Sequence, residues 1–525
     1  MPEQTQASAS IPADTQKRVF AFMIDPRTYR IAGEVRRIDT HGAAVFLAGD
    51  DVYKIKRAVK FPFMDFSTLD KRHRVCEAEI AINRPNAPDI YLGVVPITLK
   101  DGTLAIDGGG EVVEWAVHMR RFDENATLDR MADAGPISPD LARSLGDIIH
   151  RSHDGARRGD GDDAVVALRE YIDQNDEAFA ALPDLFDTAT AGNIYVRSLE
   201  HFARCEALMR QRGEDGYVRR CHGDLHLANI AMRDGAPFLF DAIEFDDAIA
   251  TCDVLYDLAF VLMDMDVRGQ REAGNILFNR YLQICDDDRQ LAGLAALPLF
   301  LSLRAAIRAK VIAAKLSQAK NSNARTSDLA AIIADAQRYF RYAADAIEPP
   351  AARLVAVGGL SGTGKSRLAL ALAPGFGRAP GAVLLRSDVE RKLLHGVADT
   401  ERLPETAYRQ DTTVKVYDRL HRKAALALGA GQSVIMDAVH ARTNERQAAE
   451  TTAAECGCPF IGLWLETPLD VRLARIAGRK NDASDATAEV AKGQAAFDTG
   501  PIAWARVDAS GDLDKTVSEA MSIVD

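Results

Sequence analysis

The sequence predicts a chain of mixed class, α/β and α+β, that folds as two domains. Its 525 residues, 47% of them apolar, exceed what a single hydrophobic core usually serves. Short alternating patterns of apolar and charged residues give way near residue 138 to long helical patterns. After Glu348-Pro349-Pro350, short apolar runs alternate with helical patterns, which is typical of a parallel sheet.

The first domain is expected over residues 17–347. Residues 1–16 are rich in Ser, Ala, Gln and Thr and predict a disordered tail. From Ala43 to Phe63 apolar and charged residues alternate around Gly49-Asp50-Asp51, which predicts a β-hairpin. A helix is expected at 67–84, and short strands at 92–98, 104–106 and 112–119. An antiparallel sheet with one helix thus precedes a helical lobe.

The second domain is expected over residues 354–525, after a linker at 348–353. Leu354–Val357 is a short apolar run that leads directly into a glycine-rich segment. Further buried strands are predicted at Val383–Arg386, Val434–Met436 and Phe460–Leu465. The intervening helical patterns are long enough for crossover connections, so the domain is predicted to be a parallel α/β sandwich.

Composition narrows the class of protein. Residues 351–525 carry equal numbers of basic and acidic residues, so the whole net charge of −12 lies before them. The seven cysteines show neither CxxC pairs nor zinc-site spacing, which predicts reduced thiols. No window approaches the ~20 apolar residues of a membrane helix. We expect a cytoplasmic protein with no membrane partner.

The segment Cys221-His222-Gly223-Asp224-Leu225-His226-Leu227-Ala228-Asn229 carries an acid and an amide five residues apart on a loop. One can accept a hydroxyl proton while the other binds magnesium. The segment resembles the catalytic loop of the aminoglycoside phosphotransferase family, small-molecule relatives of protein kinases. The resemblance implies a bilobal protein-kinase-like fold, with Asp224 as catalytic base and Asn229 as magnesium ligand. His222 is expected to be a packing residue of the loop.

The same resemblance implies a second metal-binding acid at Asp241, which ends the apolar run Pro237–Phe240. The following Ala242-Ile243-Glu244 departs from the family's pattern. It stays open whether Asp241 alone or Asp241 with Glu244 holds metal. Asp257 matches the family's helix acid that braces the catalytic loop.

The resemblance also implies a phosphate-binding lysine in the sheet lobe. Lys54 and Lys56 lie on the same face of one predicted strand, and Lys54 is favoured. Its partner acid is predicted to be Glu79, with Glu77 as the alternative. By position, the backbone at 118–120 would form the adenine-binding hinge.

Gly359-x4-Gly364-Lys365-Ser366 is a phosphate-loop (P-loop) motif in the required context, between a predicted strand and a helix. Such a loop binds phosphate through converging backbone amides at a helix start. Lys365 is predicted to bridge the β- and γ-phosphates, and Ser366 to bind magnesium. The predicted nucleotide-binding residues are Gly359, Ser361, Gly362, Thr363, Gly364, Lys365 and Ser366.

An acid follows another strand of this domain: Asp437 ends Val434–Met436 and is predicted to contact magnesium or water. Together with Thr443-Asn444-Glu445-Arg446, it resembles the pattern of polynucleotide kinases and zeta-toxin-like kinases. So does Arg386-Ser387-Asp388-Val389-Glu390-Arg391, where the resemblance implies Asp388 as the base on the acceptor hydroxyl and Arg391 as substrate holder. A capping box formed by Ser387 and Glu390 is the competing interpretation.

Arg472, Arg475 and Arg479 recur at helical spacing on one predicted face. Guanidinium groups match phosphate oxygens, so this layout suits a lid that clamps the transferring group. Arg475 and Arg479 are the preferred residues. A solvated basic face is the alternative.

The tandem order resembles proteins called bifunctional aminoglycoside phosphotransferase and ATP-binding proteins. We therefore expect two phosphotransferase sites, each using ATP (or GTP) and Mg2+ to phosphorylate a small-molecule hydroxyl acceptor. Two other hypotheses stay open. One domain could be a nucleotide-binding regulatory module, or the C-terminal domain could phosphorylate the 5′-hydroxyl of a nucleic acid.

Overall fold

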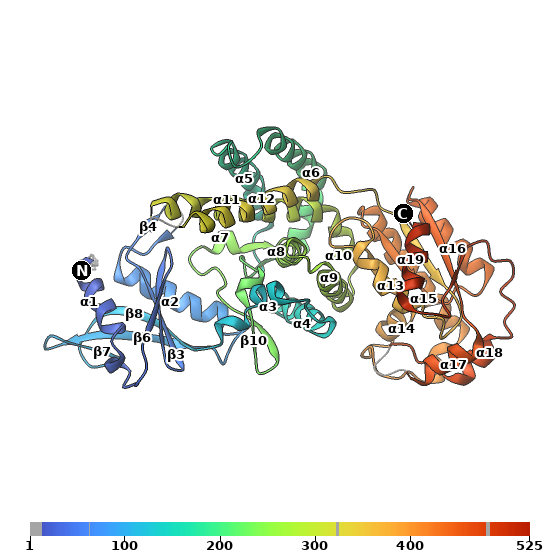
Figure 1. The fold of residues 1–525 in the computed structure, drawn as a ribbon, viewed down its shortest axis with the longest axis horizontal. Coiled ribbons are helices and arrows are strands. Elements are labelled where there is room, and N and C mark those ends of the chain that lie inside the picture. The colour runs from blue at the N-terminus through green and yellow to red at the C-terminus, as the bar shows by residue number, and fades with distance from the viewer. Residues whose placement is uncertain (1–12, 62–63, 322–324, 479–482, 525) are drawn as a thin grey trace, which may run out of the picture. The chain divides into compact units, whose positions relative to one another are not determined.

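The computed structural model describes residues 13–61, 64–321, 325–478 and 483–524 (Figure 1). These residues form two compact units. The first contains the described residues up to Ile137, together with Ile148–Ala167 and Gly213–Val261. The second contains Ser138–Asp147, Leu168–Arg212 and the described residues from Leu262 onward. The predicted linker 348–353 lies within the second unit and forms neither helix nor strand.

Within the described residues, six strands of the first unit form an antiparallel sheet in the order β1-β2-β3-β8-β6-β7 (Figure 1). They are β1 (Arg36–Asp39), β2 (Ala43–Ala48), β3 (Asp51–Lys56), β6 (Tyr91–Lys100), β7 (Thr103–Ile106) and β8 (Glu111–Arg120). The predicted hairpin is β2–β3, and Gly49 makes its turn with φ +63°. The sequence patterns gave no sign of β1.

Two helices accompany this sheet, α1 (Ala13–Met23) and α2 (Leu69–Asn83). The predicted tail is wrong for residues 13–16, because they begin α1. The Gln16 side chain is 9% exposed and donates to the Lys56 carbonyl at 3.0 Å and to Glu114 at 2.8 Å. Apolar residues of α1 pack with those of β2 and β3 in a single core. The hydrophobic core of the sheet therefore includes residues that precede its first strand.

The segment that carries the catalytic-loop motif lies among short strands: β9 (Val218–Arg220), β10 (Ile230–Arg233), β11 (Ala236–Leu239) and β12 (Thr251–Asp253). The helices of the predicted helical lobe are α3 (Leu128–Ala134), α4 (Pro139–Gly155), α5 (Gly161–Ala180), α6 (Thr188–Glu214), α7 (Asp247–Ala250), α8 (Val254–Val267), α9 (Arg271–Cys285), α10 (Asp288–Gly293), α11 (Leu297–Asn321) and α12 (Thr326–Ile347). A sheet region followed by this loop and by helices is the protein-kinase-like arrangement that the motif order predicts.

One stretch corrects the expectation about apolar windows. Among the described residues, Asp288–Leu316 is long and apolar enough to cross a membrane by length and composition alone. However, 83% of its most apolar window is buried inside the fold.

Within the described residues of the second unit, a parallel five-stranded sheet has the order β14-β15-β13-β16-β17. The strands are β13 (Leu354–Gly358), β14 (Val383–Arg386), β15 (Val434–Asp437), β16 (Phe460–Glu466) and β17 (Ala505–Asp508). The predicted α/β class is correct, although β17 was not predicted. Its helices are α13 (Lys365–Leu372), α14 (Ser387–Leu394), α15 (Gln410–Gly429), α16 (Thr443–Glu455), α17 (Leu469–Ala477), α18 (Ala488–Gln494) and α19 (Leu513–Val524).

The central strand β13 is buried along its whole length between β15 and β16. Its apolar residues belong to a core shared with α13 and α19. Burial on both faces explains why the strand reads as a continuous apolar run in the sequence. The carboxyl ends of parallel strands meet at one edge, which places the P-loop beside Asp437.

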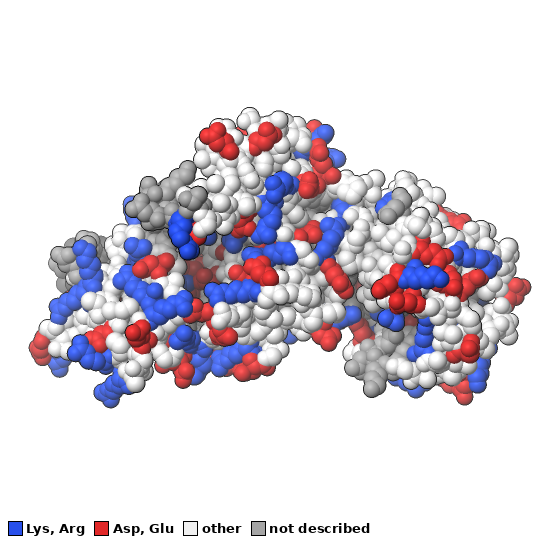
Figure 2. Space-filling model, viewed as in Figure 1, with Lys and Arg blue, Asp and Glu red and all other residues white. Residues whose placement is uncertain are grey.

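The cysteines and the charged side chains can be compared with what the composition predicts. All seven cysteines are free thiols. On the face shown in Figure 2, acidic and basic side chains are interspersed.

Candidate functional site

The first candidate site is organised around a buried ion cluster on β3 and α2. The Lys54 ammonium on β3 donates to Glu79 Oε1 at 2.8 Å and to Asp241 Oδ1 at 2.6 Å. Lys56 lies 2.6 Å from Glu79 Oε2 and also pairs with Glu244. Glu79 is fully buried and therefore joins both candidate lysines.

The alternatives for the helix acid are thus separated by burial. Glu77 points to the surface, where its carboxylate is 59% exposed and lies 3.5 Å from His73. Glu244 is only 9% exposed and is engaged with Lys56, whereas 47% of the Asp241 side chain is exposed. Of the two acids left open for metal, Asp241 is the accessible one.

The charges of this cluster hold one another ionised. Burial alone would lower the pKa of Lys54, but the carboxylates of Asp241 and Glu79 outweigh it and hold this pKa well above its usual value. Burial would raise the pKa of Glu79, yet the two lysines lower it. The pKa of Asp241 is likewise lowered by Lys54 against burial. The site therefore keeps a fixed ammonium beside an accessible carboxylate.

Two residues that the sequence patterns did not single out shape the turn that carries Asp241. This residue has a left-handed backbone with φ +59°, and its amide donates to the Tyr91 hydroxyl at 3.0 Å. The next amide, of Ala242, donates to the side chain of Asn83 at 2.9 Å. Asn83 ends α2, so the helix that carries Glu79 also fixes the turn that carries Asp241. No local sequence signal marks either contact.

The catalytic-loop residues converge as predicted. The Asn229 side chain is 8% exposed and donates to Asp224 Oδ2 at 3.0 Å and to the Asp224 carbonyl at 2.9 Å. His226 lies 3.3 Å from the same carboxylate. The Asp224 side chain is 40% exposed, so its carboxylate contacts Asn229 and His226 on one side and is accessible to an acceptor on the other. Its charge reaches Asp241, whose pKa it pushes upward against the lysine.

Asp257 on α8 braces this loop. It is fully buried, and it accepts the Gly223 amide at 2.9 Å and the His222 amide at 3.2 Å. Gly223 has φ +82°, and a Cβ there would lie 2.9 Å from the Ala250 Cβ, so only glycine fits. The His222 ring lies 2.9 Å from the Phe240 carbonyl, and burial lowers its pKa, which agrees with a packing role.

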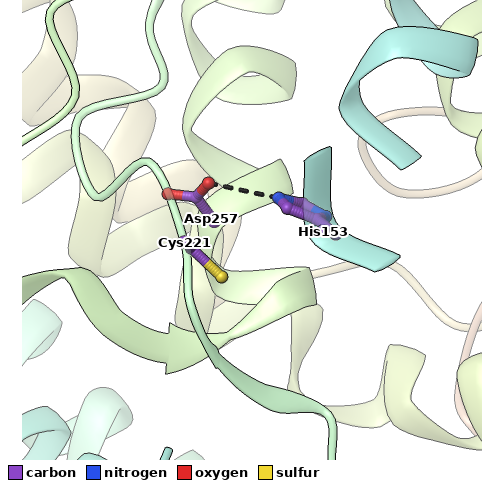
Figure 3. Close-up of side chains that lie close together, drawn as sticks. All are labelled: His153, Cys221 and Asp257. Atoms are coloured by element: carbon purple, nitrogen blue, oxygen red, sulfur yellow. Dashed lines mark hydrogen bonds and ion pairs between the residues drawn. The ribbon is translucent and has the colours of Figure 1, made fainter. Parts of the chain in front are cut away.

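His153, Cys221 and Asp257 form a buried cluster whose ligand-type atoms lie within 4.8 Å of one another (Figure 3). Both Asp257 oxygens already accept hydrogen bonds, one of them lying 3.2 Å from His153 Nε2. A side-chain hydrogen bond with Cys252 and burial hold the pKa of the Cys221 thiol well above its usual value, and the thiol also donates to the Cys252 carbonyl at 3.6 Å. Through these hydrogen bonds the cluster braces the catalytic loop.

The second candidate site is the P-loop at the end of β13. Gly364 precedes α13 with φ +101°, so Lys365 and Ser366 begin the helix. Gly362 has φ +88°, and a Cβ there would lie 2.8 Å from the Arg472 carbonyl. The Gly359 amide donates to the Val439 carbonyl at 3.1 Å and the Ser361 amide to Gln494 at 2.7 Å. Those two amides are thus engaged within the protein.

The predicted magnesium pair of this site lies in direct contact. Ser366 Oγ donates to Asp437 Oδ2 at 2.6 Å, and Asp437 is 4% exposed. Arg386 at the end of β14 lies 3.3 Å from the same oxygen. A hydroxyl and a carboxylate oxygen at a phosphate loop suit Mg2+, which binds few protein oxygens and keeps the others for water and phosphate. In the first site, Asn229 and Asp241 offer the same kind of donors.

The structure contradicts the capping-box interpretation of α14. Arg386 occupies the N-cap, and no side chain caps the helix. Glu390 is instead buried and pairs with Lys423 at 2.7 Å and Arg419 at 3.0 Å. Asp388 lies in the first turn of α14, and burial raises its pKa against a hydrogen bond from Ser484. A buried carboxyl at this position is a candidate to accept the proton of a bound hydroxyl.

One cavity of about 1320 Å3 brings the predicted residues of the second domain together. Its lining includes Ser361, Gly362, Thr363, Gly364, Lys365, Ser366, Asp388, Arg391, Asp437 and Arg475. Single small-molecule pockets usually measure ~300–1,000 Å3. This cavity therefore has room for a nucleotide and an acceptor side by side.

Arg391 is held rigidly at this cavity. It is 6% exposed, donates to the Ala407 carbonyl at 2.9 Å, and its guanidinium lies 4.8 Å from the Tyr408 ring centroid. Burial lowers its pKa, against the pull of Asp388. Tyr408 is in turn hydrogen-bonded to Asp485 at 2.5 Å. The arginine thus faces the cavity from a fixed position.

The three arginines of the predicted lid do not share one environment. Arg472 on α17 is 4% exposed and donates to the Ser361 carbonyl at 2.8 Å, so it supports the P-loop from within the fold. Arg475 lines the cavity and donates to the Thr363 carbonyl at 3.2 Å. Arg479 lies outside the described residues. Arg446, in the segment resembling zeta-toxin-like kinases, donates to the carbonyls of Thr499 and Pro501 and acts as a structural clamp.

Comparison with known proteins gives one family model and several full-length relatives. Residues 354–499 match the family model AAA_33, described as an AAA domain. The chain is 32% identical over 502 residues to Uncharacterized protein Rv2004c of Mycobacterium tuberculosis, a match that covers 92% of this chain and 94% of the relative. Uncharacterized protein Mb2027c of Mycobacterium bovis matches with the same values.

Similar solved structures fall into two groups. A choline/ethanolamine kinase family protein from Mesorhizobium loti is 14% identical, with 63% of this chain and 99% of that chain covered and a TM-score of 0.36. The ADP-bound aminoglycoside phosphotransferase APH(2'')-Ib is 13% identical, with coverages of 64% and 99% and a TM-score of 0.33. A gluconokinase from Sinorhizobium meliloti is 19% identical, with coverages of 33% and 91% and a TM-score of 0.25.

Proposed function

This chain belongs to the family of Uncharacterized protein Rv2004c, and we propose that it is an ATP-dependent phosphotransferase with two active sites. Its P-loop domain and its kinase-like fold both support phosphotransferase activity. Each site would transfer the γ-phosphoryl group of ATP to a hydroxyl acceptor in the presence of Mg2+. We propose small molecules as acceptors of both sites.

The observation that carries the proposal is the cavity of about 1320 Å3 in the second domain. A phosphate loop, a hydroxyl–carboxylate pair, a buried carboxyl and two arginines line the same space. A protein that only binds a nucleotide needs the first two of these features. The carboxyl of Asp388 and the fixed guanidinium of Arg391 add what an acceptor needs, a proton acceptor and an anchoring charge.

In the second site we assign the steps as follows. The P-loop and Lys365 bind the β- and γ-phosphates, and Ser366 with Asp437 would hold Mg2+, which neutralises phosphate charge. Asp388 takes the proton of the acceptor hydroxyl, whose oxygen forms a new bond to the γ-phosphorus. The bond between that phosphorus and the β–γ bridging oxygen breaks, and ADP leaves. Arg475 is positioned to contact phosphate oxygens, and Arg479 remains a predicted partner.

In the first site, Asp224 takes the hydroxyl proton and Asn229 with Asp241 would hold Mg2+. Lys54, kept charged by Glu79, binds phosphate oxygens of the nucleotide. The accessible Asp224 carboxylate supports the assignment, because Asn229 and His226 orient it from the buried side. As in the second site, the acceptor oxygen forms a bond to the γ-phosphorus, the bond from that phosphorus to the β–γ bridging oxygen breaks, and ADP leaves.

Radiolabelled phosphoryl transfer tests the proposal. Wild type, Asp224→Ala, Lys365→Ala and the double variant are incubated with Mg2+ and γ-labelled ATP or GTP. The acceptor panel holds sugars, nucleosides, aminoglycosides and 5′-hydroxyl oligonucleotides. Each single variant should lose one set of labelled products and keep the other, and the double variant should lose both.

Matched controls replace exposed residues of the same types. Asp234→Ala removes a carboxylate that is 90% exposed near the catalytic loop, and Lys492→Ala removes an exposed lysine of α18. Both should keep all products. If either single variant abolished every product, the two-site proposal would fail in favour of a regulatory module. If Lys365→Ala removed only labelled oligonucleotides, the second site would be a polynucleotide 5′-hydroxyl kinase.

A further inference from the structure

Helix α9, which precedes the P-loop domain by about seventy residues, presents a polar stripe to that domain. We call Asn275, Asn279, Gln283 and Asp286 the α9 stripe. Their spacing of four, four and three residues places them on one face of the helix and at its C-cap. Asn275 and Asn279 contact the same segment of the P-loop domain, whereas Gln283 and Asp286 each contact a different one. All of these residues belong to the second compact unit.

The first contact is with the free edge of the parallel sheet. Strand β14 is the edge strand, so its outer amides and carbonyls lack a strand partner. The Asn279 carbonyl oxygen accepts the Leu384 amide at 2.7 Å, and its amide group donates to the Ala382 carbonyl at 3.1 Å. Asn275, 3% exposed, donates to the Ala382 carbonyl at 3.1 Å and to the Pro380 carbonyl at 3.2 Å. The two side chains thus bond the backbone at the start of β14 and in the segment just before it.

The second contact is an ion network with α14. Asp286 accepts from Lys423 at 2.7 Å and from Arg419 at 2.7 Å. The same two cations bind Glu390 of α14, at 2.7 and 3.0 Å. Lys423 and Glu390 are almost fully buried. The carboxylate at the end of α9 therefore balances the cations that hold α14.

The third contact is with the loop after α14. Gln283 donates to the Asp399 side chain at 2.5 Å, and Arg280 pairs with the same residue at 3.4 Å. Leu403 and Pro404, a few residues later, line the cavity of the second site. The edge strand β14, the helix α14 that carries Asp388, and the loop after α14 are thus all linked to α9. The P-loop helix α13 has no bond with the four stripe residues among the described contacts.

We propose that the α9 stripe positions the acceptor side of the second site. It fixes β14 and α14, and with them Asp388 and Arg391, while phosphate binding by the P-loop is independent of it. A helix from the region resembling phosphotransferases would then be part of the P-loop enzyme. The effect on phosphoryl transfer rests on the function proposed above, whereas the effect on the local structure does not.

Hydrogen exchange on the full chain tests the structural part. Asp286→Asn removes the charge and keeps a residue that tolerates the left-handed backbone at this position, φ +41°. Asn279→Ala removes the bond to Leu384 of β14 and the bond to Ala382 just before the strand. In each variant, exchange over residues 383–394 should rise ~10-fold, the effect of one lost buried polar contact, while exchange over 365–372 stays unchanged. Protection of 359–372 on addition of ATP and Mg2+ should stay within about twofold of wild type.

The controls carry the same substitutions at exposed sites: Asp335→Asn removes a surface pair with Arg338, and Asn193→Ala a bond to Glu348. Lys423→Met should behave like Asp286→Asn, and Lys423→Arg should restore wild-type exchange. The proposal is overturned if exchange over 383–394 matches the controls, or if 365–372 loosens equally.

Kinetics in an Asp224→Ala background isolate the second site. With any acceptor that wild type phosphorylates there, Asp286→Asn should lower kcat ~10-fold and leave the KM for ATP unchanged. An unchanged kcat would overturn the positioning role. If wild type labels no acceptor, the proposed function fails at this site, and the exchange result alone decides whether α9 positions α14.

Discussion

Substitution of Glu79 by glutamine tests the ion cluster of the first site most directly. Glu79 is fully buried, accepts a hydrogen bond from Lys54 at 2.8 Å and forms an ion pair with Lys56 at 2.6 Å. The substitution keeps the shape of the side chain and removes the charge that the two ammonium groups share. Lys54 then keeps only Asp241, and Lys56 only Glu244.

Breaking a buried ion pair by removing one partner costs ~3–5 kcal/mol. Each lysine keeps one carboxylate, so we expect the lower end, about 3 kcal/mol of the free energy of unfolding. For a unit of this size that corresponds to a fall in Tm of ~6–12 °C. Glu77→Gln is the matched control on the same helix. Its carboxylate is 59% exposed, and a surface pair contributes at most ~1 kcal/mol.

The assay is urea unfolding followed by hydrogen exchange of peptides covering β3 and α2, so that only the first unit is monitored. Phosphoryl transfer by the first site is measured in parallel in a Lys365→Ala background. Glu79→Gln should reduce this transfer at least ~10-fold, because Lys54 loses its fixed position. Equal unfolding midpoints for Glu79→Gln and Glu77→Gln would refute the reasoning.

The pH dependence gives this prediction a sign. The folded-state pKa of Glu79 is lowered, so its contribution is present above its ordinary value of 4.5 and is lost as pH falls through the lower folded value. The pKa of Lys54 is raised, so its contribution is present below 10.5 and is lost as pH rises through the higher folded value. The stability difference between wild type and Glu79→Gln should therefore be largest near neutral pH.

Three further predictions concern the second site and the brace of the first. Asp388→Asn should abolish transfer by the second site yet make the protein more stable at pH 7, because burial raises the folded-state pKa of Asp388. Denaturation at several pH values should show that this gain in stability vanishes below pH 3.8. A loss of stability at pH 7 would contradict the prediction. Asp437→Asn should raise the Mg2+ concentration for half-maximal transfer ~10–100-fold, measured by magnesium titration, while Asp498→Asn, on the same cavity rim, should not. Asp257→Asn should destabilise the catalytic loop by ~3 kcal/mol, seen as faster exchange over 221–229 without a change over 365–372.

Residues whose task depends on nearby backbone could be predicted from the sequence. The P-loop needs glycines, a lysine and a serine within eight residues, and its geometry follows from that local chain. Asp224 and Asn229 likewise lie on one short loop, and the structure joins them by a 3.0 Å hydrogen bond. The strand that precedes the P-loop was visible because burial on both faces makes a continuous apolar run.

Residues whose partners come from distant elements were ambiguous or misread. The sequence favours Glu79 but leaves Glu77 as an alternative, and only the folded structure shows that Glu79 is buried whereas Glu77 is exposed. Ser387 and Glu390 fit a capping box locally, but Lys423 and Arg419 of α15 take the glutamate. Helix spacing alone could not tell that Arg472 supports the P-loop from inside while Arg475 faces the cavity.

The sequence by itself thus determined the two fold classes, the phosphate loop and the acid–amide pair of the catalytic loop. The tertiary structure decided which lysine, glutamate and arginine serve them, that Glu390 forms ion pairs instead of a capping box, and that Asp286 of α9 pairs with the same cations as Glu390 of α14. The reason is physical: backbone amides and turn glycines act over a few residues, whereas burial and ion pairing depend on side chains that folding brings together from far along the chain.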